Sequence, residues 1–192
     1  PSTEDYDGYS LFHNIAYRTI DGGLTWDSAV NAFPAQLYAD AAIPSDLKFL
    51  NKDIGYIVGA LGSIYKTIDG GITWVQQTNI PSNISTIRLE SIAIVDANIA
   101  YAVGWEGTVI KTTDGGATWI NANNGLPTLF NNFYKVLMYD ANQGMVFASG
   151  SVYTTRDGGI TWTPYYAPVS EFMFAACFAP MAPCVPETVC KK

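Results

Sequence analysis

The chain has little of the chemistry that metal centres and catalytic triads require. It holds one histidine, His13, and three cysteines, all within the last sixteen residues. Their spacing matches no zinc site, and a lone histidine without a matched nucleophile and acid forms no triad. We therefore expect no metal and no cofactor. The cysteines are either three unrelated thiols or include one disulfide that ties the C-terminal segment in an oxidising compartment. In the second case Cys184 and Cys190 form the disulfide that closes most easily, and Cys177 stays a thiol.

Basic residues and long apolar runs are also scarce. Ten Lys and Arg stand against 17 Asp and Glu, which gives a net charge of −7. Because phosphate binding needs Lys or Arg, this balance argues against nucleic acid and against an anionic membrane surface. The apolar stretches are short and interrupted by Gly, Asp and Pro, so we expect no membrane insertion. The first residues show no secretory signal pattern, which leaves open a removed signal, a fragment and a protein that was never exported.

No segment shows a helical period over ten or more residues, and aromatic residues make up 14% of the chain, so we expect an all-β protein. The sequence does contain an eight-residue motif in four nearly identical copies. Its Asp residues are spaced by 48, 45 and 43 residues, a period that indicates repeat architecture. The copies are TIDGGLTW (19–26), TIDGGITW (67–74), TTDGGATW (112–119) and TRDGGITW (155–162).

Each of the last three copies lies among four short strand-like segments, at about 46–78, 88–121 and 133–166. In each copy the Asp-Gly-Gly run interrupts the alternating pattern, because Gly supplies positive φ and Asp binds backbone amides in a tight hairpin turn. Four strands in about forty-five residues are typical of a β-propeller blade. Residues just before the motif, Arg18, Lys66 and Lys111, are expected to point outward as charges that protect a sheet edge.

The motif resembles the Asp box, or BNR repeat, of sialidases, sortilin-type receptors, some glycoside hydrolases and photosystem-assembly-factor-like proteins. Its Tyr-Lys-Thr-x-Asp-Gly-Gly-x-Thr-Trp form and the strand at 99–104 are most similar to the last group, and the resemblance spans about residues 12 to 166. It implies that the Asp ties the turn between third and fourth strands and that the Trp packs into the blade. The residues to which it gives a structural role, rather than a ligand or metal role, are Asp21, Gly23, Trp26, Asp69, Gly71, Trp74, Asp114, Gly116, Trp119, Asp157, Gly159 and Trp162.

The first unit is too short for a complete blade, because about twenty residues precede its Asp box. An apolar strand at 172–179 follows the fourth unit and could supply the missing first strand. We therefore predict a small propeller of about four four-stranded blades, closed by strand exchange between the termini, in one domain of residues 1–179 with a Pro- and Cys-containing tail at 180–192. The alternative is a fragment of a six- or seven-bladed propeller.

A catalytic site is not expected. A sialidase-like site needs three arginines around a carboxylate, yet Arg18 and Arg156 lie at Asp-box corners and only Arg88 remains. A glycosidase needs two facing carboxylates, and Glu106, the one unrepeated acid on a loop between second and third strands, has no evident partner. We therefore predict that the protein is not an enzyme.

The loops opposite the Asp boxes vary in length and composition, and variable loops on a rigid scaffold usually carry function. We predict a non-enzymatic, extracytoplasmic binding or structural propeller, which acts on a protein partner or by self-assembly as an interaction module or accessory subunit. The alternatives are an assembly factor resembling the photosystem assembly proteins, for which the net charge supports no basic docking groove, and a carbohydrate-binding or glycoside-hydrolase-like propeller with a glycan ligand. The candidate binding face consists of Phe33, Tyr38, Trp105, Glu106, Phe130, Tyr165 and Tyr166.

Overall fold

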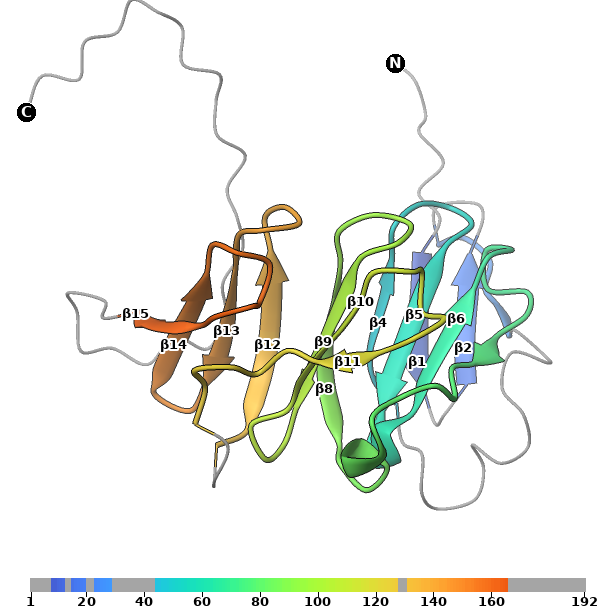
Figure 1. Ribbon diagram of the computed structural model, residues 1–192. Coiled ribbons are helices and arrows are strands. Elements are labelled where there is room, and N and C mark those ends of the chain that lie inside the picture. Colours follow the sequence, from blue (N-terminus) through green and yellow to red (C-terminus); the bar gives the residue numbers. More distant parts are fainter. Residues whose placement is uncertain (1–7, 13–14, 20–22, 29–43, 128–130, 166–192) are drawn as a thin grey trace, which may run out of the picture.

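The computed structural model describes residues 8–12, 15–19, 23–28, 44–127 and 131–165, which form four antiparallel sheets (Figure 1). The first sheet contains β1 (Gly8–Phe12), β2 (Ile15–Thr19) and β3 (Asp27–Ser28). The second contains β4 (Pro44–Phe49), β5 (Gly55–Gly59), β6 (Ile64–Thr67) and β7 (Val75–Gln76). The third contains β8 (Leu89–Ile94), β9 (Ala100–Gly104), β10 (Val109–Thr112) and β11 (Ile120–Asn121). The fourth contains β12 (Phe133–Met138), β13 (Gly144–Ala148), β14 (Ser151–Thr155) and β15 (Thr163–Tyr165).

Within every sheet the strands follow one another in chain order, each antiparallel to the last. The sheets stand side by side, and the first strand of each complete sheet meets the first strand of the next, since β8 packs against both β4 and β12. This is the blade arrangement of a β-propeller with the first strands nearest the axis, so the all-β propeller fold is confirmed. The described helical structure is limited to two 3₁₀ turns, η2 (Ala60–Gly62) and η3 (Ser82–Ile84), and no described helix is long and apolar enough to cross a bilayer.

The first blade has three described strands, and they correspond to the second, third and fourth strands of the other blades, because Thr19 ends β2 as Thr67 ends β6. Its first strand is thus missing from the described residues, as the sequence predicts. Figure 1 shows the first and fourth sheets at opposite ends of the row, an open arc that fits the alternative of a segment of a larger propeller. The closing strand predicted at 172–179, the tail and its cysteines lie outside the described residues.

The core lies between blades rather than inside one sheet. One apolar cluster joins the second and third blades, and another joins the third and fourth. The second strands β5 and β9 are buried along their whole length, which explains why they are apolar without alternation.

The three inner strands share an irregularity that positions the side chains on the axis. Each pairs with its neighbour through a register shift at its second residue, between Pro44 and Asp46 in β4, between 89 and 91 in β8, and between 133 and 135 in β12. A bulge at this point re-aims the following side chains. Asp46, Ser91 and Lys135 therefore occupy equivalent places in three blades.

Candidate functional site

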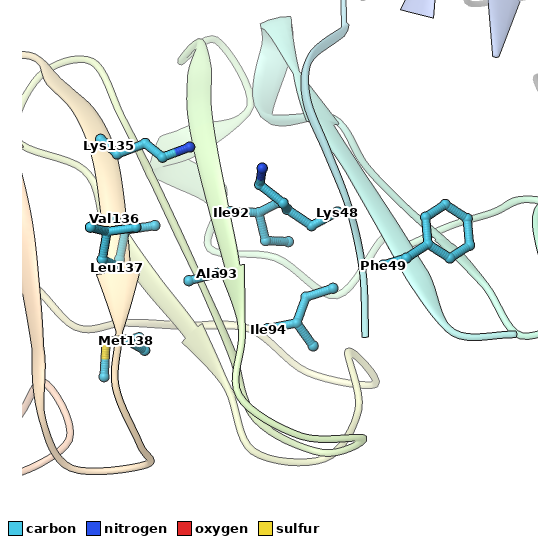
Figure 2. A pocket seen from close by; sticks show the side chains of 9 residues that line it. All are labelled: Lys48, Phe49, Ile92, Ala93, Ile94, Lys135, Val136, Leu137 and Met138. Atoms are coloured by element: carbon cyan, nitrogen blue, oxygen red, sulfur yellow. The ribbon is translucent and has the colours of Figure 1, made fainter. Parts of the chain in front are cut away.

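The described residues enclose a groove between the inner strands β4, β8 and β12. Its volume is about 390 Å³, and Figure 2 shows side chains from all three strands turned toward it. The lining residues are Lys48, Phe49, Ile92, Ala93, Ile94, Lys135, Val136, Leu137 and Met138. We call this feature the axial groove.

Two lysines and one carboxylate give the axial groove its charge. The Asp46 carboxylate lies 3.7 Å from Lys48 Nζ and 3.9 Å from Lys135 Nζ, both beyond hydrogen-bond length. Asp46 Oδ2 instead accepts hydrogen bonds from Ser91 Oγ at 3.0 Å and from the Ile92 amide at 3.1 Å. The lysine side chains remain 47% and 38% exposed, whereas that of Asp46 is 15% exposed. The two lysines and the Asp46 carboxylate that pairs with both thus sum to one net positive charge in an acidic chain.

The other end of the axial groove is apolar. Ile94 and Met138 are the last residues of β8 and β12, and Figure 2 shows both at the end away from the two ammonium groups. Each also packs partly against a core cluster, which fixes the floor. A ligand that matches this arrangement carries a carboxylate next to an apolar group. The structure shows no cluster of three metal-ligating side chains among the described residues.

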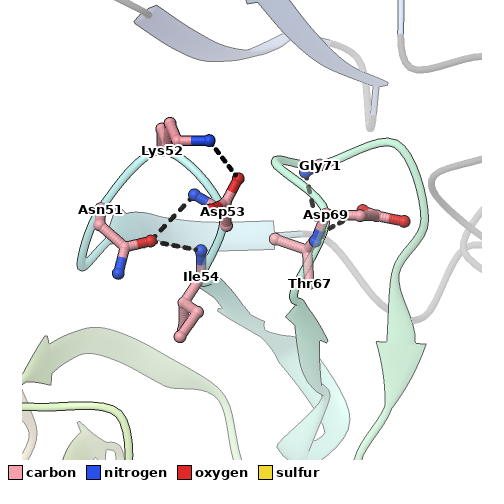
Figure 3. A network of polar contacts seen from close by, with 7 residues as sticks. All are labelled: Asn51, Lys52, Asp53, Ile54, Thr67, Asp69 and Gly71. Atoms are coloured by element: carbon pink, nitrogen blue, oxygen red, sulfur yellow. Dashed lines mark hydrogen bonds and ion pairs between the residues drawn. The ribbon is translucent and has the colours of Figure 1, made fainter.

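The Asp-box turns follow the C-terminal ends of the third strands β6, β10 and β14. Figure 3 shows that Thr67 Oγ1 accepts a hydrogen bond from the Gly71 amide at 2.9 Å and donates one to Asp69 Oδ1 at 2.8 Å. Asp69 in turn accepts from the amide of Thr73 at 2.9 Å and from its hydroxyl. Desolvation alone would raise the pKa of Asp69, but the bonds from Thr73 and Thr67 lower it below its ordinary value. The Gly70 amide binds the Asp53 carbonyl, which joins this turn to the β4–β5 turn.

The third and fourth blades repeat this network around Asp114 and Asp157, whose pKa values are lowered by hydrogen bonds from Thr118 and Thr161. In the first blade Asp21 lies outside the described residues, while the Gly23 amide donates to Thr19 Oγ1 at 2.9 Å as its counterparts do. The Asp-box tryptophans of the second to fourth blades are buried, and Trp26 is partly exposed. That the motif serves folding rather than a ligand stays a prediction.

Part of the predicted binding face is described. Trp105 is 43% exposed, and its Nε1 donates to Glu90 Oε1 at 2.7 Å. The next residue, Glu106, has φ of 55°, and its amide donates to Asn132 Oδ1. Tyr165 is exposed on β15 of the fourth blade, whereas Trp105 and Glu106 belong to the third. The other four candidates, Phe33, Tyr38, Phe130 and Tyr166, lie outside the described residues.

Reasoning from the sequence missed Asp46, Lys48 and Lys135 as a group. A signal was present: aligned by register, Lys48 stands where the other inner strands carry Ala93 and Leu137, so a charge replaces an apolar residue. Comparing the repeats position by position, rather than by their shared letters, would have found it.

Comparisons with known proteins agree with the fold. The family model described as photosynthesis system II assembly factor YCF48 matches residues 28–174. A solved structure of YCF48 bound to a D1 peptide is 26% identical, with a TM-score of 0.57 over 65% of this chain and 39% of that chain. YCF48 from Cyanidioschyzon merolae is 26% identical, with a TM-score of 0.55 over 65% of this chain and 40% of that chain. This chain thus spans about two fifths of the length of these two structures.

A GH74 xyloglucanase from Xanthomonas campestris has a TM-score of 0.63 at 16% identity, over 79% of this chain and 27% of that chain. Identity this low shows a shared fold alone. Among curated proteins, no sequence matches the chain significantly.

Proposed function

The chain belongs to the family of the photosynthesis system II assembly factor YCF48, and from this premise we propose that it is a protein-binding propeller whose axial groove holds a peptide segment of its partner. The observation that carries the proposal is the groove itself. It combines two partly exposed lysines with an apolar floor in a chain whose net charge is −7.

The groove suits a peptide that carries a carboxylate beside an apolar side chain. Lys48 and Lys135 reach over it from different blades, so that one carboxylate can meet both ammonium groups. Asp46 accepts hydrogen bonds from Ser91 and Ile92 on β8. It attracts both lysines electrostatically but accepts no hydrogen bond from either. An apolar side chain would then lie on Ile94 and Met138. The solved YCF48 structure with a bound D1 peptide supports a peptide ligand for this family.

We favour binding over hydrolysis. Glycoside hydrolysis needs two carboxyl groups that face each other across the substrate. Near the exposed Trp105, the Glu90 carboxylate already accepts bonds from Arg88 Nε at 3.0 Å and from the indole of Trp105. In the axial groove Asp46 is engaged by β8. Neither place offers a facing pair among the described side chains.

The test is peptide binding measured by calorimetry with the D1 peptide and with the same peptide after its carboxylates are converted to amides. Lys135→Met should weaken binding of the carboxylate form about tenfold, which corresponds to about 1.4 kcal/mol for a lost charged contact. The same variant should bind the amide form as the parent protein does. Lys52→Met is the matched control, because Lys52 is 76% exposed and outside the groove. Equal affinity of all three proteins for both peptides would refute a peptide site in the groove.

The extracytoplasmic location stays a proposal that depends on the clustered cysteines of the sequence. Cell fractionation of the tagged protein tests it, and recovery with the cytosolic markers would contradict it.

A further inference from the structure

The Asp-box turns of the third and fourth blades are each held by a lysine from the blade before. Lys66 on β6 donates a hydrogen bond from Nζ to the Gly115 carbonyl, in the turn of the third blade, at 2.6 Å. Lys111 on β10 donates to the Gly158 carbonyl, in the turn of the fourth blade, at 3.0 Å. Both lysines are partly buried, and desolvation lowers their pKa values despite the nearby aspartates. These contacts contradict the expectation that the two lysines point outward.

A tyrosine on the adjacent strand completes each contact. Tyr56 lies directly opposite Lys66 in the β5–β6 ladder, and Tyr101 lies opposite Lys111 in the β9–β10 ladder. The two ammonium groups lie 5.5 and 5.1 Å from the centres of these rings, within cation–π range. Tyr101 Oη also donates to the Gly158 carbonyl at 2.8 Å. We call this arrangement the Tyr–Lys clasp.

The held turn contacts the preceding blade in the other direction as well. The Trp119 amide donates to the Asn79 carbonyl at 3.0 Å, and the Trp162 amide donates to the Asn124 carbonyl at 3.1 Å. The turn packs closely on this tyrosine, because a Cβ on Gly116 would come within 3.1 Å of the Tyr56 hydroxyl. Adjacent blades are therefore joined through the Asp box in both directions.

The corresponding register positions hold different residue types in the first and the fourth blade. In the first blade Tyr9 lies opposite Arg18, so the sequence pattern supplies an aromatic residue and a cation there too. In the fourth blade Met145 lies opposite Thr154, and this pair has neither a phenol nor a cation. The first three blades thus carry the residue types of the clasp, and the fourth does not.

We propose that the Tyr–Lys clasp determines which blade can follow which: a blade that carries it holds the Asp-box turn of the next blade, and the fourth blade is not equipped to hold one. The lysine acts across the blade boundary, since its hydrogen bond ends on a carbonyl of the neighbour. An Asp-box turn bound in this way therefore cannot cover the flank of Met145 and Thr154.

Hydrogen exchange followed by mass spectrometry on the full chain tests the clasp, because it reports where protection is lost. Lys111→Met should speed exchange at least tenfold in the turn at 157–161 while leaving the turn at 114–118 unchanged. Lys66→Met should speed exchange at 114–118 and leave 157–161 unchanged. Lys111→Arg, which keeps a cationic donor, should restore most of the protection. Thr154→Met is the matched control at the equivalent position of the fourth blade, and it should alter none of the described turns.

Faster exchange confined to the variant's own blade would overturn the proposal, since the lysine would then act only on its own tyrosine. Unchanged exchange in both lysine variants would overturn it too. If Lys111→Met proves too unstable to measure, Tyr101→Phe removes the Oη bond to Gly158 while keeping the ring, and protection at 157–161 should still fall. A Thr154→Met effect as large as that of Lys111→Met would contradict the distinction between the fourth blade and the others.

Discussion

Replacing Thr112 by valine should reveal how much one Asp-box hydroxyl contributes to stability. Thr112 is 1% exposed at the end of β10. Its Oγ1 accepts a hydrogen bond from the buried Gly116 amide at 2.8 Å and donates one to Asp114 Oδ1 at 2.8 Å. Valine keeps the shape and suits a strand, so the change removes these two hydrogen bonds, and a longer one from the Asp114 amide at 3.3 Å, with little effect on packing.

The larger loss concerns the Gly116 amide. In the variant this buried N–H has no acceptor, and an unsatisfied buried donor costs about 1–3 kcal/mol. Asp114 keeps its bonds from Thr118, so the carboxylate side adds little. We therefore expect the free energy of unfolding to fall by about 1–3 kcal/mol, and the melting temperature by about 2–4 °C for each kcal/mol.

Urea denaturation followed by tryptophan fluorescence measures the change, because Trp119 lies at the end of the same turn. Thr113→Val is the matched control: it makes the same substitution at the next residue, whose side chain is exposed. Its midpoint should stay within experimental error of the parent protein. If both variants unfold at the same urea concentration, the buried hydroxyl does not stabilise the turn, and the reasoning about the Asp box is wrong.

Three further outcomes are expected. Gly104→Ala should lower the free energy of unfolding by about 1–3 kcal/mol, because the alanine Cβ would clash with the Arg88 carbonyl and lie 2.9 Å from Leu89 Cα. An unchanged urea midpoint would show that the inner strand β8 can move aside. Lowering the pH through the ordinary aspartate pKa of 3.8 should destabilise the fold. The pKa values of Asp69, Asp114 and Asp157 are lowered in the folded state, so the unfolded chain takes up protons first. Urea midpoints that stay constant from about pH 6 to about pH 3 would contradict this. Binding of the carboxylate peptide in the axial groove should weaken as salt rises, because the lysines are partly exposed and screened; salt-independent calorimetry would point to a purely apolar contact.

The sequence alone determined the repeat and its local structure. The Asp-Gly-Gly turns of the second to fourth blades, the four strands around each of them and the first strand missing from the described part of the first blade all follow from short-range rules. A hairpin turn depends on neighbouring residues, and alternation reports which face is buried. Asp69 and Thr67 are two residues apart in one turn, so their contact depends on local geometry alone.

The tertiary structure decided what lies between blades. Lys66 looked like an outward charge because its own strand gives no sign of the Gly115 carbonyl, which another blade brings to it. Lys135 reaches Asp46 on β4 only because inner strands far apart in the chain converge on the axis, each with a bulge that local alternation does not predict. Local propensity sets each strand, but the angle at which one blade packs on the next depends on side chains from both. That angle fixes the contents of the groove.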